Sequence, residues 1–252
     1  MSGHSHWATI KRSKGAADAK RGQLFTKLGR EIEIAARDGG SDPASNFRLR
    51  LAMDKAKQAS MPKENTERAI LRGTGQLKGT TIEMMTYEGY GPQGTAMIVE
   101  IVTDNRNRSA SEVRRLFSRH GGNLGETGSV AWLFDRKGYI SIMPSDDNSD
   151  ELALSAIDAG ADDVKADKEL VEVYTKAEEL QKVRDALEGT GIELDSAELS
   201  WVPKSYVELD TKATHQNMRL IDALEENEDV QQVYSNLAIS DEDMASYDEA
   251  EA

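Results

Sequence analysis

The sequence predicts an α+β protein in which an all-helical N-terminal domain precedes two α+β domains, one of them inserted in the other. Three observations favour this fold class. Apolar residues recur at helical spacing over the first 80 residues, and they alternate at strand spacing beyond residue 80. A short internal repeat near the C-terminus then indicates that the strand-containing part is made of two related units.

The first 80 residues predict three helices. The first is expected over 16–37, with its apolar residues on one face. The second is expected over 45–59, and the third from Pro62 to Gly73, because proline suits a first helical turn and glycine often follows a last one. The glycine-rich stretch 73–79 then indicates a linker.

Beyond residue 80 the alternating pattern predicts strands that are interrupted by helices. The expected elements are, in order, strands at 81–87 and 95–103, a helix at 110–119, strands at 129–134 and 139–143, a helix at 150–159, a strand at 170–175, a helix at 177–188, strands at 197–201 and 206–209, a helix at 214–225 and a strand at 230–234. The last dozen residues are acidic and contain no Lys or Arg, which predicts disorder.

The internal repeat supports the insertion. VEVYTKA at 171–177 and VELDTKA at 207–213 each lead into a helix that contains the letters DALE. Two ferredoxin-like units of βαββαβ type account for this repeat if the second interrupts the first, although a tandem arrangement would produce the same echo. The expected domains are a basic helical domain at 1–80, a discontinuous middle domain at 81–134 plus 204–239, an inserted domain at 135–203 and an acidic tail at 240–252.

Charge is strongly segregated along the chain. The net charge of −14 combines a segment 1–80 with 16 Lys/Arg against 8 Asp/Glu, which is +8, and a segment 81–252 at −22. A polyanion would therefore be attracted to one end of the protein and repelled by much of the rest. The sequence has no cysteine and no apolar run long enough to span a membrane, and its first residues lead us to expect no secretory leader. We expect a cytoplasmic monomer that binds no membrane.

The first residues combine aromatic and basic side chains. Trp7 lies close to Lys11, Arg12 and Lys14, an arrangement in which an indole stacks on a base while cations hold phosphate. A tryptophan packed on the helical domain is the alternative. His4 and His6 could face a metal, but no further ligand completes the site. We therefore expect no metal and no cofactor.

The first predicted helix has a basic face beside its apolar one. Lys20, Lys27, Arg30 and Arg37 fall in one arc, which continues the basic character of the preceding residues. A solvated face with nearby glutamates as counter-ions is the ordinary alternative. The continuity with the basic first residues favours a nucleic-acid contact.

Residues 106–119 hold five arginines and no lysine. Ser109 and Glu112 have capping-box spacing, which predicts that the helix begins at Ser109. Arg106 and Arg108 would then precede the helix, and Arg114, Arg115 and Arg119 would lie on it. The planar guanidinium suits phosphate and base edges. This predicts a second nucleic-acid contact, with an ordinary surface helix as the alternative.

No catalytic arrangement is recognisable. The four histidines stand at positions 4, 6, 120 and 215, and the sequence has neither a nucleophile elbow nor a phosphate-cradling loop with its lysine. EGYGPQG is glycine-rich, but it joins two predicted strands and is typical of a hairpin turn. We therefore expect a protein that is not an enzyme and that has no small-molecule substrate.

Four long motifs resemble the YebC family, the bacterial relatives of the mitochondrial translational activator of cytochrome oxidase subunit one. They are GHSHWATIKRSKGAADAKRGQLFTKLGREI, MPKENTERAILRGTG, YEGYGPQG and TDNRNRSASEVRRLFSRHGGNLGETGSVAWLF, and the resemblance extends to about residue 237. It implies a helical domain and two α+β domains, the last inserted in the middle one. Family members are described as transcriptional regulators that bind DNA, and as ribosome-associated factors that help translation through consecutive prolines.

The resemblance also implies which residues contact nucleic acid. It places contacts on Lys11, Arg12, Lys14, Lys20 and Arg21, and on Arg106, Arg108 and Arg119. Family members usually have lysine where this chain has His6. Together with the charge pattern, the candidate contacts are Trp7, Lys11, Arg12, Lys14, Lys20, Arg21, Lys27, Arg30, Arg106, Arg108, Arg115 and Arg119.

The expected function is regulation of gene expression through RNA on the ribosome, as a translation factor that relieves stalling. The sequence shows no helix-turn-helix, and a body of −22 would meet duplex phosphates on either side of a docked basic end. Folded RNA offers irregular phosphates and exposed bases, and ribosomal proteins offer basic surface. The alternative is a transcriptional regulator that uses the same basic face on promoter DNA.

Overall fold

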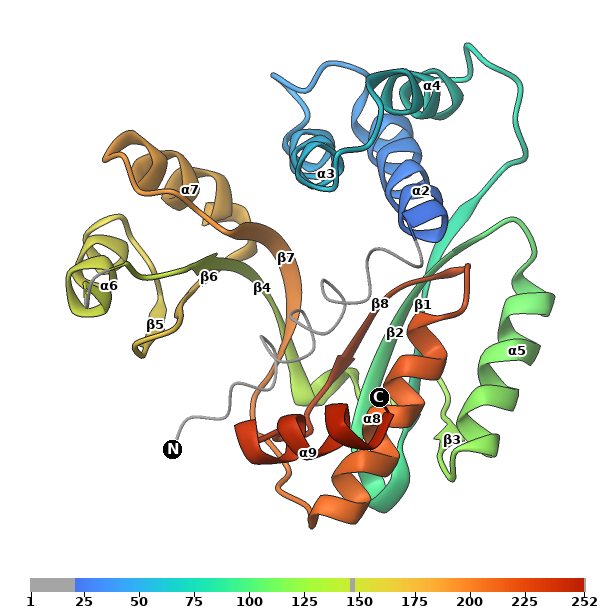
Figure 1. Ribbon diagram of the computed structural model, residues 1–252. Helices are drawn as coiled ribbons and strands as arrows, with labels where there is room; N and C mark the ends of the chain where they lie inside the picture. Colours follow the sequence, from blue (N-terminus) through green and yellow to red (C-terminus); the bar gives the residue numbers. More distant parts are fainter. Residues whose placement is uncertain (1–20, 146–147, 252) are drawn as a thin grey trace. The chain divides into compact units, whose positions relative to one another are not determined.

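The computed structural model describes residues 21–145 and 148–251, which form the α+β fold expected from the sequence (Figure 1). Helices come first along the chain, and two four-stranded antiparallel sheets follow. The described residues divide into two compact units, one made of 21–134 with 203–251 and the other of 135–145 with 148–202. The predicted contacts Trp7, Lys11, Arg12, Lys14 and Lys20 lie outside the described residues.

Three helices form the basic part of the first unit. They are α2 (Arg21–Gly39), α3 (Phe47–Gln58) and α4 (Lys63–Gly73), which confirms the three helices predicted within this range. Leu28 and Ile32 of α2 pack with Leu49 of α3 and Ala69 of α4 in one apolar core. Helix α2 passes so close to α4 that a Cβ at Gly73 would lie 2.3 Å from the carbonyl oxygen of Glu33. Apolar burial at helical spacing therefore fixes this part of the fold.

The first sheet has the strand order β3-β1-β2-β8. Its strands are β1 (Glu83–Tyr90), β2 (Ala96–Thr103), β3 (Asn123–Leu124) and β8 (Val230–Ser235). Helices α5 (Arg106–Arg119) and α8 (Thr211–Glu225) pack on one face of it, where Phe117 and Leu224 join Val99, Ile101 and Val233 in the core. Every residue of β2 is buried, as expected for the central strand of a covered sheet.

The chain order of this first sheet differs from the βαββαβ order that the repeat predicted. Strands β1 and β2 are joined only by a short turn, Pro92–Gly94, and pair as an antiparallel hairpin before the first helix of the sheet begins. Gln93 and Gly94 both adopt positive φ there, at 61° and 80°. So few residues cannot contain a helical crossover, which leaves antiparallel pairing as the connection.

The second unit does have the βαββαβ order, and its sheet has the strand order β5-β6-β4-β7. Its elements are β4 (Phe134–Ile142), α6 (Ser149–Asp158), β5 (Asp163–Ala166), β6 (Val171–Lys176), α7 (Leu180–Gly189) and β7 (Ser196–Pro203). The sequence pattern missed β5, which has only four residues, none of them buried. It also placed a strand at 129–134, where a 3₁₀ turn (Ala131–Leu133) leads into β4 instead.

Two predictions near the C-terminus are wrong. The stretch 206–209 forms only an isolated bridge between Val207 and Leu237, not a strand. The acidic tail expected to be disordered forms helix α9 (Asp241–Glu251). Tyr247 of α9 is buried with Met218, and its hydroxyl donates to Asp222 Oδ2 at 2.8 Å. Charge composition missed this helix because one well-packed tyrosine outweighs several solvated carboxylates.

No helix among residues 21–145 and 148–251 is long and apolar enough to cross a membrane.

Candidate nucleic-acid interface

The basic face of α2 is partly used inside the protein. Lys27 donates through Nζ to the carbonyl oxygen of Glu225 at 2.6 Å. Arg30 Nη1 lies 2.6 Å from the carbonyl oxygen of Glu228 and 3.0 Å from Asp229 Oδ1. Both cations therefore hold α2 against the end of α8 and the start of β8, while Arg21 stays exposed at the first described turn. Nucleic-acid contact by Lys27 and Arg30 stays a prediction.

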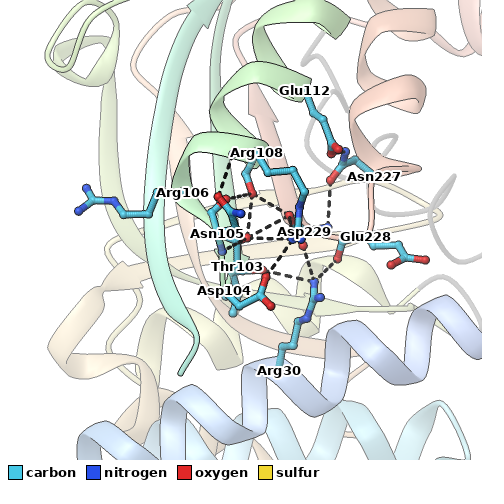
Figure 2. Close-up of polar contacts among 12 residues, drawn as sticks. Arg30, Thr103, Asp104, Asn105, Arg106, Arg108, Glu112, Asn227, Glu228 and Asp229 are labelled. Atoms are coloured by element: carbon cyan, nitrogen blue, oxygen red, sulfur yellow. Dashed lines mark hydrogen bonds and ion pairs between the residues drawn. The ribbon is translucent and has the colours of Figure 1, made fainter. Parts of the chain in front are cut away.

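Asp229 is the centre of a polar cluster that joins three elements (Figure 2). Its side chain is only 5% exposed, and it receives hydrogen bonds at Oδ2 from Ser109 Oγ at 2.7 Å and Thr103 Oγ1 at 3.0 Å. Arg108 Nη2 lies 2.9 Å from the same oxygen, and Arg30 binds Oδ1. The carboxylate thus links α2 to the start of α5 and the start of β8.

This environment keeps Asp229 ionised. Burial by itself would raise the pKa of Asp229, but the hydrogen bonds from Ser109, Arg108 and Thr103 and the charge of Arg108 hold it below its ordinary value. The same hydrogen bond and charge raise the pKa of Arg108. A buried carboxylate with two guanidinium partners is a structural joint, because removing it would leave Arg30 without its counter-ion and Arg108 with Asp104 alone.

Helix α5 begins earlier than the capping-box spacing predicted. Asn105 caps it by accepting from the backbone N–H of Arg108 at 3.1 Å, so Arg106 and Arg108 lie in the first turn and not before the helix. Ser109 is buried inside the helix, where its hydroxyl binds Asp229. Glu112 accepts from Asn227 Nδ2 at 2.9 Å. The capping-box prediction is therefore wrong, because both side chains have tertiary partners.

The arginines of α5 differ in the ion pairs that they make within the protein. Arg106, Arg108, Arg114, Arg115 and Arg119 are all exposed. Positions 108, 115 and 119 fall on one stripe of the helix, since steps of seven and four residues return to nearly the same angle. Arg108 is held at Asp229, whereas Arg106 approaches only the exposed Glu83, at 3.8 Å. The stripe offers Arg115 and Arg119 to an external anion.

The sequence analysis did not single out four residues of this unit, namely Asp229, Thr103, Glu88 and Trp132. Asp229 stands in the acidic run EENED, where nothing distinguishes it from its solvated neighbours. Glu88 is buried in β1, and Trp132 is exposed in the turn after β3. The alternation of polar and apolar residues does not reveal a buried carboxylate whose hydrogen-bond donors lie far away in the sequence. Among the described residues, no group of three or more His, Cys, Asp or Glu side chains could hold a metal ion.

Comparison with known proteins identifies the family. The model of the TACO1/YebC protein N-terminal domain matches residues 5–76, and the model of the TACO1/YebC second and third domain matches residues 82–237. The chain belongs to the TACO1/YebC family. The resemblance seen in its four motifs is thereby confirmed over nearly the whole chain.

Relatives of the TACO1/YebC protein described here are similar over almost their full length. A protein of Desulfosudis oleivorans is 54% identical over 96% of this chain and 98% of its own, and one of Moorella thermoacetica is 55% identical over 95% and 96%. Both are called probable transcriptional regulatory proteins. The crystal structure of a conserved hypothetical protein from Aquifex aeolicus has a TM-score of 0.83 at 47% identity, covering 89% of this chain and 93% of that one. The names point to regulation and do not state the nucleic acid involved.

Proposed function

We propose that this TACO1/YebC protein is a non-enzymatic regulator of gene expression that binds RNA on the ribosome and relieves stalled translation. The observation that carries the proposal is the segregation of charge, with +8 in residues 1–80 and −22 in the rest of the chain. An RNA-rich particle with basic proteins offers complementary surface to both parts, whereas a bare duplex offers it only to the first.

The contacts of α2 support this hypothesis. Lys27 and Arg30 hold α2 against the end of α8 and the start of β8. Helices α2 and α5, the latter with the exposed Arg115 and Arg119, therefore belong to one compact unit, which an irregular RNA surface could engage at both helices. Long-range attraction to phosphate would bring the basic part in first.

A second function, promoter DNA binding, is favoured by the names of the relatives, which are called transcriptional regulatory proteins. It would use the same cations on duplex phosphates. The described residues include no pair of helices that we recognise as a helix-turn-helix, so sequence-specific readout would depend on the arginines of α5 or on residues 1–20.

Sedimentation of cell lysate through a sucrose gradient at moderate salt tests the proposal. We expect the wild-type protein in ribosomal fractions and the variant Lys11→Ala/Arg12→Ala/Lys14→Ala at the top of the gradient. The variant Lys57→Ala/Lys63→Ala/Arg68→Ala is the matched control, because it also removes three exposed cations, of which Lys63 and Arg68 pair with Glu67 and Glu64 of their own helix.

Two results would contradict the translation hypothesis. One is absence of the wild-type protein from ribosomal fractions. The other is retention on one promoter sequence over random duplex DNA at about 150 mM salt, where non-specific electrostatic binding is already weak. The second result would support the DNA alternative.

A further inference from the structure

Trp132 is a large aromatic side chain that is mostly exposed to solvent. The residue is 64% exposed in the turn Ala131–Leu133, between the short strand β3 and β4. Its indole Nε1 donates to the carbonyl oxygen of Ser129 at 3.0 Å, so the polar atom of the ring is satisfied locally. The faces of the ring remain available to a flat ligand, because the residue is mostly exposed.

The loop that carries Trp132 is held by a buried carboxylate. Glu88 of β1 is 6% exposed, and its two oxygens accept from the backbone N–H groups of Gly128 at 2.7 Å, Val130 at 2.8 Å and Ala131 at 2.7 Å. These hydrogen bonds outweigh the effect of burial and lower the pKa of Glu88. The glycine-rich loop is thus fixed by three donors immediately before the tryptophan.

Two further contacts fix the loop on either side of the ring. Tyr90 donates through its hydroxyl to the carbonyl oxygen of Ser129 at 2.8 Å. Lys204 donates through Nζ to the carbonyl oxygen of Trp132 itself at 2.9 Å. The ring is therefore presented from a preorganised backbone, which lowers the entropic cost of binding a partner, and the Lys204 ammonium lies at the main chain of the same residue.

The surroundings of Trp132 fit a single flat ligand better than an apolar protein surface. In the described part of this unit, the other large apolar side chains that are clearly exposed are Leu71 and Leu77, which lie in and just after α4. An isolated aromatic ring with an ammonium group at the carbonyl oxygen of the same residue matches one nucleobase and the phosphate attached to it. A protein interface is wider than one ring, with a more apolar core inside a polar rim.

We propose that Trp132 is a stacking site for an unpaired base of single-stranded RNA, with Lys204 beside the adjoining phosphate. This inference rests on the proposed function, since it presumes that the protein meets RNA, and it adds a base-binding site that the basic segments do not supply. Bases inside a duplex are stacked on their neighbours, so the site would select unpaired nucleotides.

Tryptophan fluorescence tests the inference directly. The sequence has three tryptophans, at 7, 132 and 201, so the variant Trp7→Phe/Trp201→Phe reports on Trp132 alone. We expect a twelve-residue oligouridine to quench this fluorescence at moderate salt, and duplex DNA of equal length to leave it almost unchanged. In the wild-type background, Trp132→Ala should weaken oligouridine binding about tenfold, while Trp132→Phe should retain most of it.

Leu154→Ala is the matched control, because Leu154 is also 64% exposed and lies on α6 of the other unit. Its affinity for oligouridine should equal that of the wild type. Oligouridine binding without quenching, and with full affinity in Trp132→Ala, would overturn the stacking site and leave the proposed function standing. Equal quenching by duplex DNA would overturn the preference for unpaired bases. No binding of any RNA by the wild type would overturn the proposed function itself.

Discussion

Two buried carboxylates organise the first unit in different ways. Glu88 is satisfied by backbone N–H groups from one loop, at 2.7 to 2.8 Å. Asp229 is satisfied by side chains from three separate elements, namely Arg30 of α2, Thr103 of β2, and Arg108 and Ser109 of α5. The first arrangement shapes a local loop, and the second joins the basic helix to the sheet. The comparison shows that one buried carboxylate can fix the conformation of a single loop, whereas another can hold together elements that are far apart in the sequence.

The largest expected effect on stability comes from replacing Asp229, the carboxylate that joins α2 to α5 and β8. Asp229→Ala leaves Arg30 and Arg108 without their shared counter-ion and removes the acceptor of Ser109, so we expect a loss of about 3 kcal/mol in the free energy of unfolding. Urea unfolding measures it. Asp38→Ala, which removes an exposed acid paired with Arg37 and Arg48, should cost about 0.5 kcal/mol or less. Equal losses in the two variants would contradict the role of the joint.

A smaller effect on stability is expected when Glu88, which holds the loop before Trp132, is replaced. Glu88→Gln keeps one acceptor oxygen but replaces the other with an amide that must face backbone donors, so we expect a loss of about 1–2 kcal/mol. Hydrogen exchange should show faster exchange at Gly128, Val130 and Ala131, whose amides donate to Glu88, and little change at α2. Exchange that increases across the whole unit instead would show that Glu88, like Asp229, acts beyond its own loop.

The pH dependence sharpens the comparison further. The pKa values of Glu88 and Asp229 both lie below their ordinary range, so each contributes stability above about pH 4 that is lost as pH falls through the folded-state pKa. The stability lost in Glu88→Gln should therefore become smaller below pH 4.

The opposite pH dependence is expected at Glu33. Burial raises the pKa of Glu33 despite its neighbouring arginines, so Glu33→Gln should become more stable relative to wild type as pH rises. Urea titrations between pH 3 and 7 measure both.

The smallest effect on stability is expected at the exposed arginines. Arg115→Ala/Arg119→Ala should change the free energy of unfolding by no more than about 0.5 kcal/mol, because both side chains are exposed. If they hold phosphate, the slope of log affinity for RNA against log salt should fall by about one for each arginine replaced. An unchanged slope would remove α5 from the interface, and filter binding at several salt concentrations measures it.

Much of the fold could be predicted from particular residues. Helical spacing of Leu28 and Ile32 placed α2, and the strand-sized apolar run from Ala96 to Val102, interrupted only by Glu100, placed β2. Strand β5 was missed because it has only four residues and none of them is buried, and α9 was missed because charge composition concealed Tyr247. The N-terminus of α5 was misplaced because Ser109 and Glu112 have capping spacing but bind Asp229 and Asn227 instead.

The candidate interface, too, could be predicted from the sequence only in part. The sequence indicated its chemistry, namely lysines, arginines and an aromatic side chain near the start of a chain that is acidic elsewhere. It could not show that Lys27 and Arg30 contact carbonyl oxygens of residues 225 and 228, almost 200 positions away. It also did not distinguish Trp132, whose exposure depends on a loop held by Glu88.

The sequence by itself determined the family, the fold class and the segregation of charge, because these depend on residue type, local spacing and contiguous motifs. Only the tertiary structure decided which charges are used inside the protein and which face outward. The physical reason is that a hydrogen bond or an ion pair depends on distance in space, and Asp229 acquires its partners only when α2, α5 and β8 have packed together.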